Sequence, residues 1–475
     1  MLLKPVIENV MKKLIVAAVC VVSLLGPVRG QDVSEDDALF LRSIYDKALT
    51  ESACYDHLTY LSEVIGGRLA GSPQAAAAVE YTRQIMEEIG MDSVWLQPCI
   101  VPHWVRGAAE EARIVNSSKM GTVELSVTAL GNSVGTDPGG LTAEVVEVKS
   151  LDEVDRLGEN LRGKIVFFNR PMDPRHVRTF HAYGGAVDQR GSGPARAARY
   201  GAVAAIVRSM TPGIDDIPHT GVTIYEEGGA KIPAVAVSTH DAEILSTVLS
   251  EEPVRVYLKT DCKMLEPVLS YNVIGEIRGS DYPEEIILVG GHLDSWDIGG
   301  GAHDDGAGCV HSLEVIRLFN LIGYRPKRTI RCVMFMNEEN GLAGGVAYAD
   351  SSNARGEYHL AAIESDAGGF SPRAFSLDGH EETIGGYARR AAEWLPLLEP
   401  YGITFTTGGS GADISPLKSQ KGLLLGLRPD SQRYFDYHHT AVDRIDAVSK
   451  RELELGAAAM AAMVYLIDKY GLQAD

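Results

Sequence analysis

The residues of this chain that could do chemistry lie in a few short segments of its second half. They are imidazoles and carboxylates: His292, Asp294, Asp304, Glu338, Glu339, Asp366, His438 and His439. Two imidazoles and three carboxylates suit two Zn²⁺ ions that share one bridging carboxylate, with a further glutamate free to move protons. The pattern therefore predicts a metal-dependent hydrolase.

Alternating strands and helices after about residue 264 should position these side chains. Strands are expected over 285–290, 329–336 and 360–363, with helices over 308–319 and 341–350 between them. This alternation implies a mostly parallel central sheet flanked by helices, in which ligands gather at the carboxyl ends of the strands. His292, Glu338 and Asp366 each follow one of these strands, so we expect them at one edge of the sheet.

The same pattern suggests a division of roles among these residues. A single histidine or aspartate at a strand end is more often a turn residue than a ligand. Because no Lys or Arg stands in these segments, however, the carboxylates would repel one another without metal ions. Asp304 is the expected bridge, and Asp294 is expected to orient the His292 imidazole. One residue of the Glu338-Glu339 pair should bind metal and the other act as the base; their spacing does not say which.

Length, composition and charge limit the class of protein. A chain of 475 residues exceeds what one hydrophobic core supports, which predicts two or three domains. With 45% hydrophobic and 23% charged residues, the chain is typical of a globular protein. A formal net charge of −20 disfavours binding to nucleic acid and to anionic membranes.

The N-terminus predicts export to the periplasm or secretion. Met11-Lys12-Lys13 precedes an apolar run over 14–25 and small residues before Gln31, which is typical of a signal peptide over residues 1–30. The run is shorter than the ~20 residues of a membrane span, so no stable span is expected after cleavage. A retained anchor and a lipid at Cys20 are the less favoured alternatives. The five later cysteines lack Cys-x-x-Cys spacing, so neither a disulfide framework nor a thiolate zinc site is indicated.

In the first half of the chain, the sequence predicts helices and strands that carry few candidate ligands. Ser72 and Pro73 begin an expected helix that Gly90 ends. From about residue 127 the pattern changes to strands over 161–168, 201–207 and 232–237 with a helix over 194–200, as in an inserted module. The scattered histidines of this stretch are interpreted as surface or core residues: His176, His181, His219 and His240.

Several motifs resemble the M28 family of dinuclear zinc peptidases, most closely its carboxypeptidase Q branch. They are Gly291-His-Leu-Asp-Ser-Trp-Asp297, Asp304-Asp305-Gly306, Arg325-Pro-Lys-Arg-Thr329, Glu364-Ser-Asp-Ala-Gly368 and Tyr434-Phe-Asp-Tyr-His-His439. The resemblance implies an α/β peptidase domain over 31–126 and 265–475. It further implies a β-rich α/β protease-associated module inserted over 127–264, where Gly163-Lys-Ile-Val and Ile232-Pro-Ala-Val are similar to that module.

The resemblance also implies a role for each site residue. His292 and Asp366 would hold one zinc, Glu339 and His439 the other, with Asp304 between them. Glu338 would be the base, and His438 is the alternative to His439. Further implications are a cis peptide bond after Asp304, a homodimer, and a substrate-facing loop over 408–416 that contains Asp413 and Ser415.

The activity that this resemblance implies is hydrolysis of short peptides or dipeptides with unblocked ends. Two other interpretations stay open: aminoacyl transfer, as in the similar glutaminyl cyclases, and a catalytically silent receptor or scaffold on the same fold. Neither the end preference nor the side-chain preference for the substrate follows from the residues.

Overall fold

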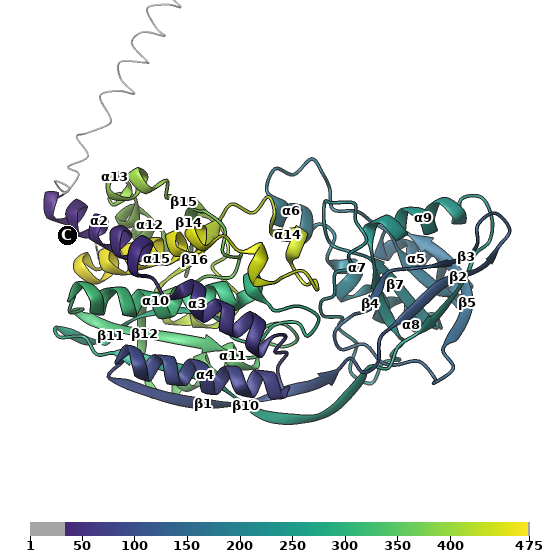
Figure 1. Cartoon of the computed structure of the whole chain (residues 1–475), viewed down its shortest axis with the longest axis horizontal. Helices are drawn as coiled ribbons and strands as arrows, with labels where there is room; N and C mark the ends of the chain where they lie inside the picture. Colours follow the sequence, from purple (N-terminus) through teal and green to yellow (C-terminus); the bar gives the residue numbers. More distant parts are fainter. Residues whose placement is uncertain (1–33, 474–475) are drawn as a thin grey trace, which may run out of the picture.

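The computed structural model describes residues 34–473 and has two α/β parts, each built on an eight-stranded sheet (Figure 1). The predicted signal peptide and Cys20 lie outside the described residues. The first sheet has, in spatial order, β1 (Ser93–Val105), β10 (Lys263–Ile277), β12 (Arg328–Phe335), β11 (Tyr282–His292), β13 (Tyr358–Glu364), β16 (Leu423–Pro429), β14 (Pro372–Gly379) and β15 (Thr404–Thr407).

The centre of the first sheet is parallel. Strands β12, β11, β13 and β16 pair in parallel, whereas β10 and β14 join this group in antiparallel pairs. Every residue of β12 is buried, as expected for a strand covered on both faces. The predicted strands of this region, and the α/β fold class, are therefore confirmed. Parallel pairing covers the middle of the sheet and also the edge pair β14–β15, with antiparallel pairs between them and at the other edge.

Helices cover both faces of this sheet. One face packs against α2 (Glu35–Glu51), α4 (Pro73–Ile89), α10 (Ala307–Ile322) and α15 (Lys450–Tyr470), and the other against α11 (Ala343–Arg355). The shorter helices of this part are α3 (Cys54–Thr59), α12 (Ile384–Ala392), α13 (Leu395–Leu398) and α14 (Tyr434–Tyr437). Helix α4 confirms its sequence prediction, because Ser72 caps its first turn and Gly90 ends it in the left-handed conformation.

The second sheet is built by the segment between β1 and β10. Its strands, in spatial order, are β3 (Gly121–Glu124), β2 (Glu111–Ser117), β9 (Arg255–Lys259), β5 (Leu141–Val148), β6 (Ile165–Phe168), β7 (Ala204–Arg208), β8 (Ala234–Val237) and β4 (Val127–Ala129). Its helices are α5 (Leu151–Leu157), α6 (Thr179–Gly184), α7 (Asp188–Gly191), α8 (Gly193–Arg199) and α9 (Thr239–Leu249).

The second sheet begins earlier in the chain than the boundary expected at residue 127. Strands β2 and β3 lie before that residue, yet β2 pairs with β9 of the second sheet. The local sequence could not show this, because the partner of β2 lies more than a hundred residues later. The identity of this part as a protease-associated module stays a prediction.

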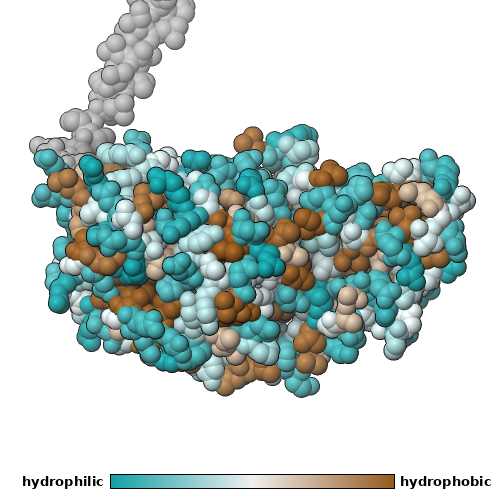
Figure 2. Space-filling model, in the orientation of Figure 1, coloured by the Kyte–Doolittle hydropathy of each residue, from teal (hydrophilic) through white to brown (hydrophobic). Residues whose placement is uncertain are grey.

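The described residues contain no disulfide, and their five cysteines are all buried: Cys54, Cys99, Cys262, Cys309 and Cys332. Within residues 34–473, no helix has the length and apolar character needed to cross a membrane. Figure 2 shows that hydrophilic residues dominate one face of the molecule, with hydrophobic residues in separate patches.

A buried carboxylate joins the first and last helices of the first part. Asp37 on α2 accepts hydrogen bonds from Tyr465, Lys469 and Tyr470 at the end of α15. Burial alone would raise the pKa of Asp37, but these donors lower it to about 2. Since the folded-state pKa lies below the ordinary value, the ionised carboxylate stabilises the fold above about pH 4, and this stabilisation is lost as the pH falls toward 2.

We therefore expect Asp37→Asn to lower the free energy of unfolding by about 2 kcal/mol at pH 7, because hydrogen bonds to charged groups are strong. Urea denaturation followed by circular dichroism measures this change. The difference from wild type should shrink as the pH is lowered toward 3. Asp36→Asn, at an exposed neighbouring position, is the control and should change stability by less than about 0.5 kcal/mol. Equal stability of Asp37→Asn and wild type at pH 7 would contradict this account.

Candidate metal centre

Three adjacent parallel strands bring the predicted site residues to one edge of the first sheet. Strand β11 ends at His292, which lies beside Phe335 at the end of β12. Glu338 and Glu339 follow β12 after two residues, and Asp366 follows β13 after one. The carboxyl ends of parallel strands meet at one edge, so these side chains converge as the alternating pattern predicts.

Asp304 lies between two groups of side chains. Its Oδ1 is 3.3 Å from Nε2 of His292, and that nitrogen is 3.6 Å from Oδ1 of Asp366. Its Oδ2 is 3.2 Å from Nε2 of His439, which is also 3.2 Å from Oε2 of Glu339. Two ligands about 2.0–2.2 Å from one tetrahedral zinc ion are roughly 3.4 Å apart. The spacing of both groups is therefore that of ligands around a shared ion.

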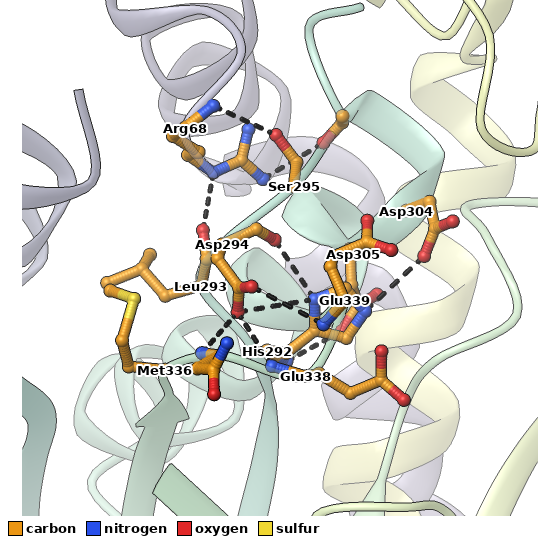
Figure 3. A network of polar contacts seen from close by, with 12 residues as sticks. Arg68, His292, Leu293, Asp294, Ser295, Asp304, Asp305, Met336, Glu338 and Glu339 are labelled. Atoms are coloured by element: carbon orange, nitrogen blue, oxygen red, sulfur yellow. Dashed lines mark hydrogen bonds and ion pairs between the residues drawn. The ribbon is translucent and has the colours of Figure 1, made fainter. Parts of the chain in front are cut away.

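The turn after β12 is held by the carboxylate of Asp294. It accepts hydrogen bonds from the backbone N–H groups of Asn337 at 2.6 Å and Glu338 at 3.0 Å, with a longer one from Glu339 at 3.4 Å (Figure 3). These bonds hold the backbone of the two glutamates together. Asp294 therefore positions the Glu338-Glu339 pair.

The expected contact of the Asp294 carboxylate with the His292 imidazole is not formed. The nearest carboxylate oxygen is 4.0 Å from Nδ1 of His292, whereas the backbone carbonyl oxygen of Asp294 is 3.0 Å from it. Asp294 therefore contacts the imidazole through its backbone carbonyl group rather than its carboxylate, which accepts hydrogen bonds from backbone N–H groups of the next loop. Its orienting role stays a prediction. A carbonyl acceptor at Nδ1 leaves Nε2 free to face Asp304 and Asp366.

Two other buried aspartates fix the backbone around Asp304. Asp443 accepts hydrogen bonds from the backbone N–H groups of His303 at 2.7 Å and Asp304 at 3.1 Å. Asp305 accepts from the N–H of His292 at 3.1 Å and that of Gly308 at 3.0 Å. The peptide bond between Asp304 and Asp305 is cis, which confirms the prediction.

Arg68 holds the loop between His292 and Asp304. Its guanidinium donates to the carbonyl oxygens of Leu293 at 2.5 Å, Gly300 at 2.7 Å and Gly301 at 3.0 Å (Figure 3). The side chain is fully buried. It replaces water as the donor to these carbonyl groups and so fixes the path of the loop.

The second part of the molecule supports the histidine pair from behind. The backbone N–H of Thr220 donates to the carbonyl oxygen of His439 at 2.9 Å, and Nδ1 of His219 lies 2.8 Å from the carbonyl oxygen of His438. Nδ1 of His439 lies 3.3 Å from the carbonyl oxygen of Thr220 and 3.4 Å from Nη1 of Arg190. Residues of both parts therefore determine where the His439 ring lies.

The contacts of His439 and His438 show which of the two histidines is better placed to bind a metal ion. The two rings stack with centroids 3.5 Å apart, and Nε2 of His438 is 3.8 Å from Oδ2 of Asp304. By distance alone, His438 also fits a three-residue metal group with Asp304 and His439. Only His439 pairs with both Asp304 and Glu339, so its position suits the second ion better.

Opposite charges shift the pKa values in this cluster. Burial alone would lower the pKa of His439, but Glu339 and Asp304 raise it to about 10. Burial alone would raise the pKa of Asp304, but His292 and His439 hold it well below its usual range. Burial raises the pKa of Glu338 well above its usual range and that of Glu339 to about 7, with neighbouring carboxylates adding to both. The carboxylates outnumber the cations here, an imbalance that divalent metal ions remove.

Two further observations test whether these residues fit metal ions. Oδ2 of Asp304 and Oε1 of Glu339 are buried and have no hydrogen-bond partner among the described residues. A cavity of about 10 Å³, lined in part by Asp304, Glu339 and His439, lies beside them. Such a volume is close to the minimum that one water molecule needs, so it suits a single small ion. The donor set, its spacing and the partnerless oxygens therefore fit zinc.

Sequence reasoning missed most of the residues that support this centre. Arg68, Arg190 and His219 carry no local signal, and His219 was interpreted only as a surface or core residue. Asp305 belongs to the Asp304-Asp305-Gly306 motif, but no role was assigned to it. Asp443 was easier to find, because it lies only four residues after the predicted ligand His439 in the sequence. In the predicted substrate-facing loop, Gly408 and Gly409 line a cavity and Asp413 is fully buried; that the loop faces a substrate stays a prediction.

The chain is similar to known peptidases over most of its length. Residues 272–464 match peptidase family M28. Carboxypeptidase Q of Bos taurus is 36% identical over 90% of this chain and 87% of its own length, and that of Homo sapiens is 35% identical over 90% and 88%.

Solved structures show the same fold. The crystal structure of a peptidase M28 precursor from Shewanella amazonensis SB2B is 33% identical, with a TM-score of 0.87 over 93% of this chain and 99% of that one. BSAP, a zinc aminopeptidase from Bacillus subtilis, shares the fold with a TM-score of 0.61 at 22% identity, over 88% of this chain and 95% of that one. On this evidence, the chain belongs to peptidase family M28.

Proposed function

We propose that this protein is an exported dinuclear zinc exopeptidase that hydrolyses short peptides or dipeptides with unblocked ends. Its family makes it a metallo-exopeptidase. The observation that carries the finer proposal is the position of Asp304, whose two oxygens face two separate imidazole–carboxylate groups. One carboxylate placed in this way suits two ions.

In this proposal, His292 and Asp366 would hold one zinc, Glu339 and His439 would hold the other, and Asp304 would be shared by both. When bound, the zinc pair lowers the pKa of water to about 7 and polarises the scissile carbonyl group. Asp294, Asp305 and Asp443 keep the ligands in place through backbone hydrogen bonds.

Glu338 is the proposed general base. Its side chain is partly exposed, and no hydrogen bond to its carboxylate is formed within residues 34–473. Burial and the nearby carboxylates raise its pKa well above the usual range, which is the direction that makes a carboxylate a stronger base. Glu338 would take a proton from the attacking water and return it to the leaving amine.

The two alternative functions predict different outcomes. A silent scaffold would lack ligands, yet all five predicted ligand residues converge here. A glutaminyl-cyclase-like transferase would prefer a peptide with an N-terminal glutamine to free dipeptides. Export, the periplasmic or secreted location, and the homodimer rest on the sequence and the resemblance, and stay predictions.

Glu338→Gln should reduce kcat for a good dipeptide substrate by about 10²–10⁴-fold, because it removes the base. Its zinc content should stay at the wild-type value, since the metal ligands are untouched. Stopped assays of dipeptide hydrolysis, together with elemental analysis, measure both quantities. Glu284→Gln, at an exposed position, is the matched control and should leave both unchanged. Near wild-type turnover by Glu338→Gln would remove Glu338 from this role.

Elemental analysis of the purified chain should find about two zinc ions per molecule. Chelator should abolish hydrolysis of a dipeptide panel, and added zinc should restore it. Asp304→Asn should lose both ions, because it changes the shared ligand. A stoichiometry of one, or activity that survives complete removal of metal, would contradict the dinuclear proposal.

A further inference from the structure

A cavity of about 370 Å³ lies next to the metal centre, at the junction of the two parts. Ala367, the residue directly after Asp366, forms part of its wall. Residues of β14, β15 and β16 line one side, and residues at the start of α6 line the other, near α14 in Figure 1. Its volume falls in the range of small-molecule sites, about 300–1,000 Å³. It is large enough for part of a peptide, unlike the small cavity beside Glu339.

The cavity is lined by cationic groups on a protein of net charge −20. Arg178, Arg373 and Arg428 line it together with His181, and no Asp or Glu does. Excess positive charge in a concave surface attracts anions. The lining is therefore opposite in sign to the molecule as a whole.

Arg428 is the most firmly held of the three arginines. Its Nε donates to Oγ of Ser376 at 2.9 Å, and its Nη2 donates to the carbonyl oxygens of Gly409 and Ser410. Within residues 34–473 it forms no ion pair with a carboxylate, and burial lowers its pKa. Asp366 and Glu364 oppose this lowering of the pKa, but neither forms an ion pair with Arg428. A partly buried guanidinium whose direct acceptors are all neutral is costly unless an anion pairs with it.

The other two arginines are exposed and add charge. Arg178 forms no ion pair with any described residue, and Arg373 pairs with Asp430 at 3.4 Å through side chains that are 60% and 42% exposed. An exposed pair of this kind is weak, so Arg373 can still attract an anion. Arg178 comes from the second part of the molecule, which would therefore take part in binding.

We propose that this cavity binds a carboxylate group of the peptide, with Arg428 as the specificity-determining contact and Arg178 and Arg373 as supporting charges. The inference rests on the proposed function, because it takes the neighbouring metal centre as the place of hydrolysis. A guanidinium binds a carboxylate through paired hydrogen bonds. That carboxylate is either the free C-terminus of the substrate or an acidic side chain.

Two matched substrate pairs distinguish these sources. Ala-Ala against Ala-Ala amide reports on the C-terminal carboxylate, and Ala-Glu against Ala-Gln reports on the side chain. Wild type should prefer the charged member of at least one pair by about tenfold or more in kcat/KM. Arg428→Gln should reduce that preference to about twofold, mainly by raising KM for the charged substrate, and Arg428→Lys should partly restore it.

If Arg428→Gln does not fold, Arg178→Gln tests the same proposal. Arg178 is exposed, so its replacement should not disturb folding. It should weaken the same preference by a smaller factor. Arg389→Gln, on α12 and outside the cavity, is the matched control and should leave both ratios unchanged. The inference is wrong if wild type shows no preference in either pair, or if the Arg428 and Arg178 variants lower kcat/KM equally for charged and uncharged substrates.

Calorimetric titration of the chelator-treated full-length protein separates this inference from the proposed function. Ala-Ala and Ala-Glu should bind more tightly than their uncharged partners in at least one pair, and Arg428→Gln should remove that difference. If wild type hydrolysed no peptide, the proposed function would fail while the titration still decided the binding site. Equal affinities of the wild type for charged and uncharged peptides would overturn the inference.

Discussion

The arrangement of the site depends on how the negative charge of the Asp304 carboxylate is compensated. This buried carboxylate lies between two imidazoles from distant stretches of the chain, one at the end of β11 and one after α14, and each of its oxygens faces one of them. Glu338, Glu339 and Asp366 crowd the same edge of the sheet. Asp304 and Glu339 are buried and Glu338 and Asp366 partly buried, so their negative charges are costly unless cations compensate them. The proposed metal centre would supply the positive charge that this edge of the sheet otherwise lacks.

Buried charged side chains that bind backbone groups keep these ligands in place. Arg68 donates to carbonyl groups of the loop before Asp304. Asp443 accepts from the consecutive N–H groups of His303 and Asp304, and Asp294 from those of the turn that carries Glu338 and Glu339. Because each such side chain fixes two or more backbone groups, it sets the direction of the neighbouring ligands. A centre supported in this way is formed before substrate arrives, which is what efficient catalysis requires.

The second part of the molecule belongs to the site as well. Thr220, His219 and Arg190 lie behind the histidine pair, and Arg178 lines the cationic cavity beside Asp366. A segment inserted between β1 and β10 thus contacts both the candidate metal centre and the candidate binding site. Changes in how the two parts pack against each other would alter both at once.

The sequence by itself determined the alternation of strands and helices, the ends of α4, and the set of residues that meets at the carboxyl edge of the sheet. These follow from hydrophobic period, capping residues and short motifs, which are local properties. Only the tertiary structure decided that β2 joins the second sheet and that the Asp294 carboxylate holds the Glu338-Glu339 turn. It also decided that the buried Arg68 and the partly buried Arg428 donate to carbonyl groups. Each of these depends on a partner distant in the chain, and such partners are set by packing of the whole molecule, which no local pattern records.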